Sequence, residues 1–313
     1  MCENLQSKKV AIVLPVYNVE PFLSECLHSI LSQTHTNFTI FAIDDASTDK
    51  STEILEQYKF HDNRIIILKH KTNRGLSATR NTALDEIEKI GSYDYISFCD
   101  SDDVVSQNMI SELLSAVVEN NADIATCCFK RFPSDKKNIS RFENFCSFTP
   151  ESFVEQIFSI GRWKKTSGNG GYVCLRLFNA QKIKGLRFQN EKTLSEDELF
   201  CLEAAAKVSK ITYIPKALYF YRTRINSLSK DKEFHRKLLR SRIAGLDFSQ
   251  KISRYALIVN ACAILHKSKQ NNDLLCKQLL LNITPLLREG KKLGLISKTK
   301  YWSFIMKNLT KLF

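Results

Sequence analysis

Carboxylates gather directly after two apolar runs of the sequence. Asp44 and Asp45 follow the run Phe38–Ile43, and the acidic segment Asp100–Asp103 follows the run Tyr95–Cys99. If both runs are buried parallel strands, their carboxyl ends meet at one edge of a sheet, where ligands of such sheets bind. Crowded carboxylates repel one another, and a hard divalent cation that also binds a diphosphate relieves the repulsion. The pattern predicts a site for a hard divalent cation, although a solvated acidic turn is the simpler alternative.

A second acidic pair, Glu196 and Asp197, begins a predicted helix at 196–207. A carboxylate at the start of a helix can simply favour the positive end of the helix dipole. The histidines form no HxxxH or comparable cluster, so we interpret all of them as structural or surface residues.

Apolar runs typical of strands alternate with segments of helical periodicity through the first 130 residues. The expected strands are 10–15, 38–43, 64–68, 95–99 and 123–129, and the expected helices are 21–33, 52–58, 77–90 and 109–119. This alternation predicts an α/β fold with a Rossmann-like, mostly parallel sheet flanked by helices. Residues 130–195 are less regular and include a glycine-rich loop at 166–173, and two short strands are expected at 211–215 and 217–222.

The net charge of +13 lies entirely in the C-terminal part of the 313-residue chain. Residues 230–313 carry 18 Lys and Arg against 5 Asp and Glu, in a pattern that predicts a basic helical extension. An anionic membrane surface is the favoured partner, because 287–313 mixes lysines with aromatic residues as interfacial helices do. Nucleic acid is disfavoured, since the segment has no nucleic-acid-binding motif. A helical cap or a dimer surface is the remaining alternative.

Targeting signals are not evident. The N-terminal residues show no signal peptide, and the longest apolar run, 255–265, is shorter than the roughly 20 residues of a membrane-spanning helix. Ten cysteines without CxxC spacing favour free thiols. We expect a cytoplasmic protein, peripheral at the inner face of the cytoplasmic membrane.

Six segments resemble the motifs of family 2 glycosyltransferases, inverting enzymes with the GT-A fold, of the type that builds bacterial surface glycans. In chain order these are PVYN (15–18), IDDASTDKS (43–51), NRGLSATRN (73–81), FCDSDD (98–103), SEDELF (195–200) and FYRTRINSLS (220–229). The resemblance implies a GT-A domain over 1–229, with a nucleotide half at about 1–103 and an acceptor half at about 104–229. Residues 230–313 lie beyond every motif.

The resemblance also implies a role for each matching residue. The nucleotide-binding set would be Pro15, Tyr17, Asn18, Asp45, Asn73, Arg80, Asp100 and Ser101. Asp45 would accept a hydrogen bond from the base, and Arg80 would neutralise phosphate charge. Asp102, with Asp100, would bind Mn²⁺ or Mg²⁺ as the DxD motif. Asp197 would be the catalytic base, supported by Glu196.

A last set of residues, Arg222, Arg224 and Ser227, would close over the diphosphate. Arg224 stands where many family members have His, so this position cannot supply a metal ligand. Taken together, the motifs predict inverting transfer of a hexose or N-acetylhexosamine from a UDP-sugar to a hydroxyl of a growing lipooligosaccharide or capsule glycan. A lipid-linked acceptor would explain the basic segment 230–313. Two other classes stay open: a nucleotidyltransferase acting on a sugar phosphate, and a non-catalytic glycan- or lipid-binding relative.

Overall fold

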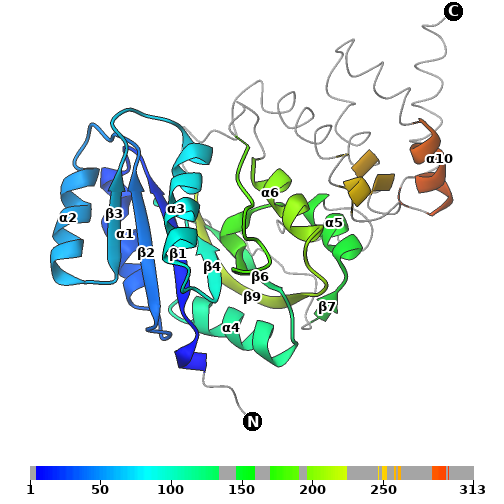
Figure 1. Cartoon of the computed structure of the whole chain (residues 1–313), viewed down its shortest axis with the longest axis horizontal. Helices are drawn as coiled ribbons and strands as arrows, with labels where there is room; N and C mark the ends of the chain where they lie inside the picture. Colours follow the sequence, from blue (N-terminus) through cyan, green and yellow to red (C-terminus); the bar gives the residue numbers. More distant parts are fainter. Residues whose placement is uncertain are drawn as a thin grey trace, which may run out of the picture.

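The structure is a computed structural model that describes most of the first 223 residues and parts of the remainder. The described residues are 5–133, 146–158, 170–189, 196–223, 246, 249–251, 257–258, 260–261, 284–293 and 295. Within them, helices cover both faces of one central sheet (Figure 1). The architecture is therefore the three-layered α/β arrangement that the sequence predicts.

The sheet has nine strands in the described part of the chain, in the order β3-β2-β1-β4-β8-β6-β9-β5, with β7 also paired to β9. The strands are β1 Val10–Val16, β2 Phe38–Asp44, β3 Ile65–Lys69, β4 Tyr95–Phe98, β5 Val104–Val105, β6 Ile124–Phe132, β7 Cys146–Phe148, β8 Arg176–Asn179 and β9 Ile211–Arg222. The first four are mutually parallel, as is β9 with β6. β8 runs antiparallel between β4 and β6, and β5 and β7 run antiparallel to β9.

The helices divide between the two faces of the sheet. They are α1 Glu20–Leu31, α2 Ser51–His61, α3 Leu76–Ile90, α4 Met109–Glu119, α5 Pro150–Phe158, α6 Glu196–Ala205 and α10 Thr284–Lys292, with short 3₁₀ turns at Leu5–Ser7 and Val173–Leu175. Side chains of α3, α5 and α6 share one apolar cluster, and those of α1, α2 and α4 share the other. Alternate residues of β1 enter opposite clusters, because successive strand side chains point to opposite faces.

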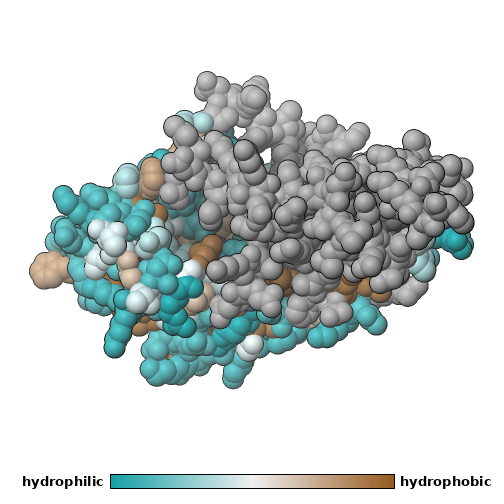
Figure 2. All heavy atoms as spheres, turned by 90° about the horizontal axis from the view of Figure 1, so that it is seen from above, coloured by the Kyte–Doolittle hydropathy of each residue, from teal (hydrophilic) through white to brown (hydrophobic). Residues whose placement is uncertain are grey.

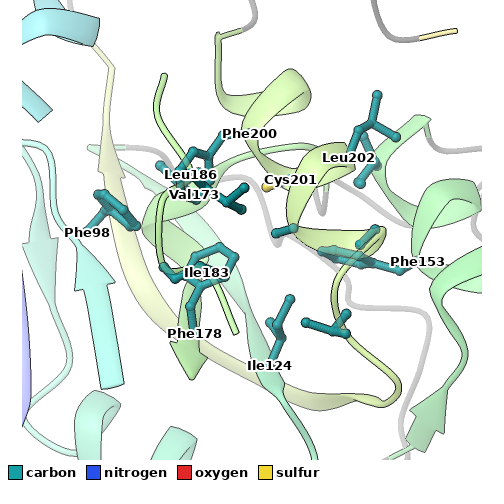
Figure 3. Close-up of a cluster of buried hydrophobic side chains, with 14 of the residues drawn as sticks. Phe98, Ile124, Phe153, Val173, Phe178, Ile183, Leu186, Phe200, Cys201 and Leu202 are labelled. Atoms are coloured by element: carbon teal, nitrogen blue, oxygen red, sulfur yellow. The ribbon is translucent and has the colours of Figure 1, made fainter. Parts of the chain in front are cut away.

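The cluster on the α3, α5 and α6 side fixes α6 against the sheet. Phe98 from the end of β4 meets Phe178 of β8 and Phe200 of α6 edge to face, with ring centroids 5.9 and 5.7 Å apart. Phe188 stacks on Phe200 at 4.3 Å. Figure 3 shows Phe98, Phe178 and Phe200 with Phe153 and with buried aliphatic side chains of the same cluster. Aromatic pairs of this kind add about 0.5–1.5 kcal/mol each beyond the area that they bury.

The carboxyl ends of β1, β2 and β4 meet at one edge of the sheet, as predicted. Val16 at the end of β1 is level with Asp44 at the end of β2, and Val13 is level with Phe98 of β4. Beside this edge, the Asp49 carboxylate accepts hydrogen bonds from the N–H groups of Glu20 and Ser51 at 2.9 and 3.0 Å. It therefore satisfies free donors in the first turns of both α1 and α2.

The sequence analysis placed the regular elements of the N-terminal half and missed several short ones. β5, β7, β8 and α5 were not predicted, and the two strands expected after residue 210 form the single strand β9. The pairing of β9 with β6 shifts register between Thr126 and Cys128, where Pro215 interrupts the ladder. Within the basic helical extension expected at 230–313, the structure describes α10, and most of the remaining residues lie outside the described part of the chain.

The surface of the described residues is mainly hydrophilic on the face seen in Figure 2, with scattered hydrophobic side chains. Among the described helices, none is both long and apolar enough to span a bilayer.

The loop before β8 packs so closely on α6 that it requires glycine. A Cβ added to Gly171 would lie 2.5 Å from Cγ and 2.6 Å from Cα of Glu198. Because the second of these atoms belongs to the helix backbone, we expect Gly171→Ala to push the loop off α6 and to lower the free energy of unfolding by about 1–3 kcal/mol. Chemical denaturation measures this change.

Gly170→Ala is the matched control, since its added Cβ would have only ordinary contacts at 3.6 Å. Equal stability of the two variants would contradict this packing.

Candidate active site

One buried guanidinium joins acidic residues from two distant parts of the chain. Arg80, on the second turn of α3, is 1% exposed. Its Nη1 donates to Asp197 Oδ1 at 2.6 Å and to Glu196 Oε1 at 3.3 Å, and its Nη2 donates to Asp100 Oδ1 at 3.0 Å. The DxD loop after β4 and the acidic start of α6 are therefore held together by one side chain.

The charges in this cluster shift one another's protonation equilibria. Burial alone would lower the pKa of Arg80, but the three carboxylates outweigh it and raise that pKa. Burial is also the largest influence on Asp197 and raises its pKa; Arg80 opposes this, and Glu196 and Asp100 add to it, so that the pKa is about 7. A carboxylate poised near neutral pH can accept a proton at physiological pH and is typical of a general base.

The loop before β8 positions the second oxygen of Asp197. The N–H of Val173 donates to Asp197 Oδ2 at 3.3 Å, and Cys201 donates through its thiol to Gly171 O at 3.3 Å. Buried Arg176 donates to Gly170 O at 2.8 Å and also to Tyr172 O. The described end of the glycine-rich segment is thus anchored to α6, and Gly171 and Val173 are positioning residues that sequence reasoning missed.

The DxD loop is closed by groups from β9. Tyr219 Oη donates to Asp103 Oδ2 at 2.7 Å and accepts from the N–H of Asp100 at 3.2 Å. The N–H of Arg222 donates to Asp103 Oδ1, and its Nε donates to Asp102 O, both at 2.7 Å. Burial, with the neighbouring Asp100 and Asp102, raises the pKa of Asp103 to about 8.

Asp103 therefore anchors the DxD loop to β9. The sequence motif alone could not distinguish this role from the roles of Asp100 and Asp102. Arg222, expected over the diphosphate, lies at this loop and also binds Glu25 Oε2 at 2.5 Å. Its guanidinium is stacked between the rings of Phe132 and Phe22, at 4.4 and 5.1 Å from their centroids.

At the end of β1, the predicted nucleoside residues differ in exposure. Pro15 is buried within the strand, whereas the side chain of Tyr17 is 46% exposed beside the sheet edge. Asn18 adopts a positive φ of 49°, and its Oδ1 accepts from the N–H of Thr48 at 2.8 Å. Ala46 also has a positive φ, 61°, the backbone region that favours glycine.

Asp45 organises the loop that leads into α3. Its Oδ1 lies 2.6 Å from His70 Nδ1 and accepts from the N–H of Arg74 at 2.9 Å, and its Oδ2 accepts from the N–H of Gly75 at 2.8 Å. Burial would raise the pKa of Asp45, but the hydrogen bonds, that of His70 foremost, outweigh it and lower the pKa. The carboxylate is therefore ionised and can only accept.

The remaining predicted residues are placed as follows. Asn73 is exposed in the loop before α3, and Ser101 is 5% exposed in the DxD loop. Arg224 and Ser227 lie outside the described residues. Arg80, expected on the phosphates, has both Nη atoms on carboxylates, so a direct phosphate contact stays a prediction.

The carboxylates after β4 provide a partial site for a hard cation. The described residues contain no ready-made group of three or more His, Cys, Asp or Glu side chains that could hold a metal. The donor chemistry still fits, because Mg²⁺ and similar ions are commonly bound by one or two carboxylates together with substrate phosphates and water. Asp102, half-buried, and Asp100, whose side chain is 31% exposed, are the residues that would supply these carboxylates.

Comparison with known proteins now identifies the family. The family model "Glycosyl transferase family 2" matches residues 11–185. GlyA of Streptococcus pneumoniae is 34% identical over 243 residues, which are 72% of this chain and 32% of GlyA, so the chain spans about a third of that protein. The uncharacterized glycosyltransferase EpsJ of Bacillus subtilis is 31% identical over 278 residues, 81% of this chain and 78% of EpsJ.

Solved structures agree on the fold. Residues 1–349 of S. aureus TarS in complex with UDP-GlcNAc superpose with a TM-score of 0.64 at 18% identity, covering 95% of this chain and 90% of that chain. The mannosyltransferase PcManGT of Pyrobaculum calidifontis, in complex with GDP-Man and Mn²⁺, superposes with a TM-score of 0.52 at 14% identity. The likeness supports a GT-A-like fold. Since the family model covers more than half of the chain and includes the edge that carries Asp45 and the DxD loop, the chain belongs to glycosyl transferase family 2.

Proposed function

We propose that the chain transfers a hexose or N-acetylhexosamine from a UDP-sugar to a hydroxyl of a growing surface glycan, with inversion at the anomeric carbon. The observation that carries this proposal is the joining of the DxD loop and Asp197 through Arg80. A donor diphosphate beside Asp100 and Asp102 would place its sugar near one well-positioned carboxylate. One base opposite the leaving group suits a single displacement.

The chemical step needs few groups. Asp197 Oδ1 is held by Arg80, and Oδ2 accepts from the N–H of Val173 with one of its two lone pairs. The second lone pair of Oδ2 would accept the proton of the acceptor hydroxyl. The hydroxyl oxygen then forms a bond to the anomeric carbon as the bond from that carbon to the diphosphate oxygen breaks, and UDP leaves with the electron pair. Glu196 shares Arg80 with the base and supports its orientation. General-base catalysis of this kind contributes about 10²–10⁴-fold in rate.

The leaving group requires charge neutralisation. Asp102, with Asp100, would hold Mn²⁺ or Mg²⁺, which supplies Lewis-acid stabilisation of the departing diphosphate. The Mn²⁺ named for the structural relative PcManGT supports this choice. Tyr17 and Asp45 would line the nucleoside pocket with Pro15, Asn18, Asn73 and Ser101, and Arg222, Arg224 and Ser227 would close over the diphosphate.

Relatives narrow the classes of donor and acceptor. The UDP-GlcNAc complex of TarS supports a UDP-sugar donor. A poly(ribitol-phosphate) beta-glucosyltransferase of Bacillus spizizenii is 30% identical over 218 residues, 68% of this chain and 32% of that protein. A cell-surface polymer is therefore the proposed acceptor class, with lipooligosaccharide, capsule and polyol-phosphate chains as its members.

Calorimetric titration with UDP, CDP and GDP tests the donor class. We expect UDP alone to bind tightly, and only with Mn²⁺ or Mg²⁺, because the acidic loop would otherwise repel the diphosphate. Asp102→Ala should remove the metal dependence and weaken UDP binding. Pyrophosphate release from UTP in the presence of a sugar phosphate would instead support a nucleotidyltransferase, and no turnover of any sugar nucleotide would support the non-catalytic alternative.

The pH dependence of kcat/KM tests Asp197 as the base. A base is active when deprotonated, and the pKa of Asp197 is raised to about 7. We therefore expect kcat/KM to rise about tenfold per pH unit below about 7 and to level above it, since kcat/KM reports groups of the free enzyme. A profile that is flat from pH 5 to 8 would contradict this assignment.

Asp197→Asn removes the base while keeping the shape of the side chain. We expect kcat to fall by about 10²–10⁴-fold with UDP affinity nearly unchanged, and the rising limb near pH 7 to disappear. Asp62→Asn is the matched control, because Asp62 precedes β3 at the opposite edge of the sheet and binds Arg64. Near-normal turnover by Asp197→Asn would rule out the base role.

We also propose that the basic 230–313 region contacts anionic lipid, which would bring the enzyme to a lipid-linked acceptor. In the described part, α10 exposes Arg288 and Lys292, and Leu293 beside them is 54% exposed. Lysine and arginine near an anionic surface contribute about 1 kcal/mol each. Flotation with vesicles that contain phosphatidylserine should carry the protein, and Arg288→Glu with Lys292→Glu should reduce the floated fraction. Equal recovery with neutral vesicles would contradict a charge-based contact.

A further inference from the structure

Asp45 has a nearly complete set of hydrogen bonds inside the protein. A carboxylate offers about four lone-pair directions, two on each oxygen. Oδ1 accepts from Arg74 N–H and faces His70 Nδ1, and Oδ2 accepts from Gly75 N–H. Among the described residues, one direction on Oδ2 remains for a ligand.

His70 is held on both sides. It follows β3 directly, its backbone N–H donates to Asp44 O at 2.9 Å, and its side chain is 6% exposed. Nε2 lies 2.9 Å from Thr82 Oγ1, whose hydroxyl also lies 3.0 Å from Ala78 O. Because the Asp45 carboxylate can only accept, the hydrogen of this contact is on Nδ1 of His70. The imidazole thus bridges the end of β2 and the second turn of α3.

The contact with His70 fixes the orientation of the Asp45 carboxylate. A carboxylate at a strand end can rotate about its Cβ–Cγ bond unless both oxygens are fixed. The backbone N–H groups of Arg74 and Gly75 belong to a loop, and Gly75 has a φ of 86°. His70 contributes the donor that comes from the rigid sheet, at the shortest distance of the three, 2.6 Å.

We propose that His70 is a positioning residue for nucleobase selection: it holds Oδ1 of Asp45 so that the free direction on Oδ2 accepts from a ring N–H of the base. The inference rests on the proposed function, namely that the pocket at this edge binds a UDP-sugar. Uracil presents a donor, N3–H, flanked by two carbonyl oxygens. Cytosine has an unprotonated N3, which would face the carboxylate lone pair and be repelled.

His70 allows a matched pair of substitutions. In His70→Asn the side-chain amide can place its N–H close to the position of Nδ1, which preserves the donor to Asp45. In His70→Gln the amide reaches toward the position of Nε2 and Thr82, and the donor to Asp45 is lost. Both variants are neutral, polar and smaller than or similar to His, so their folding is compared by thermal denaturation before binding is measured.

The experiment is calorimetric titration of UDP and CDP, with Mn²⁺, into the wild-type protein, His70→Asn, His70→Gln, Asp45→Asn and the Asp45→Asn, His70→Gln double variant. A hydrogen bond to a charged group is worth enough for about a tenfold change in affinity. We expect His70→Gln to weaken UDP binding about tenfold and to leave CDP binding within about twofold, and His70→Asn to retain most of the UDP affinity. In the Asp45→Asn background, His70→Gln should change neither affinity, because His70 acts through Asp45.

Equal weakening of UDP and CDP in His70→Gln would overturn the inference, since a general loss of structure predicts that result. A further tenfold loss in the Asp45→Asn background would overturn it too, because His70 would then act independently. Failure of the wild-type protein to bind UDP is seen before any variant is compared, and it would overturn the proposed function as well as this inference.

Discussion

The site depends on one buried cation. Arg80 is the side chain through which Asp100 at the end of β4 and the Glu196–Asp197 pair at the start of α6 are joined. A buried arginine remains charged, and its planar fork can serve several carboxylates at once, which lysine could not do with the same geometry. Taking one partner away from a buried ion pair leaves the other charged and costs about 3–5 kcal/mol. The arrangement of donor loop and base is therefore coupled to folding, and neither can move far without the other.

Helix α3 connects the sheet edge at Asp45 with the acidic cluster around Arg80. Asp45 fixes the start of the helix through the N–H groups of Arg74 and Gly75, and Arg80 follows one turn later. On the next residue, the side-chain amide of Asn81 exchanges two hydrogen bonds of 2.8 Å with the backbone of Phe188. The ring of Phe188 in turn lies 5.1 Å from the Arg80 guanidinium. Helix α3 thus connects the predicted nucleoside pocket at Asp45 with the predicted catalytic base, Asp197.

Much of this arrangement follows from local sequence signals, and the rest depends on distant contacts. The sequence predicted that Asp45 and the DxD loop lie at one edge of the sheet. Both follow apolar runs, and the carboxyl ends of parallel strands meet at one edge. β8 is only four residues long and lies antiparallel between β4 and β6, so its own pattern is too short to be informative. Tyr219 contacts Asp103, and Gly171 packs on Glu198, in each case across more than twenty residues of sequence. Hydrophobic periodicity gives no information on such distant contacts. His70 could have been singled out, since it follows a predicted strand at the same edge as Asp45.

The excess of negative charge at this edge of the sheet explains why a divalent cation and a diphosphate would bind there together. Asp100, Glu196 and Asp197 form ion pairs with Arg80. Asp102 and Asp103 follow Asp100 in the same loop, where Arg222 Nε donates to the Asp102 carbonyl oxygen. The raised pKa values of Asp103, about 8, and of Asp197, about 7, show that burial and neighbouring carboxylates already disfavour full ionisation. A diphosphate alone would add to this excess of negative charge, and a divalent cation alone would lack ligands on its open side. Binding the two together relieves both costs, so the acidic edge favours the metal–diphosphate pair over either partner. Burial, together with repulsion from Glu196 and Asp100, raises the pKa of Asp197 to about 7, so this carboxylate can accept a proton near neutral pH.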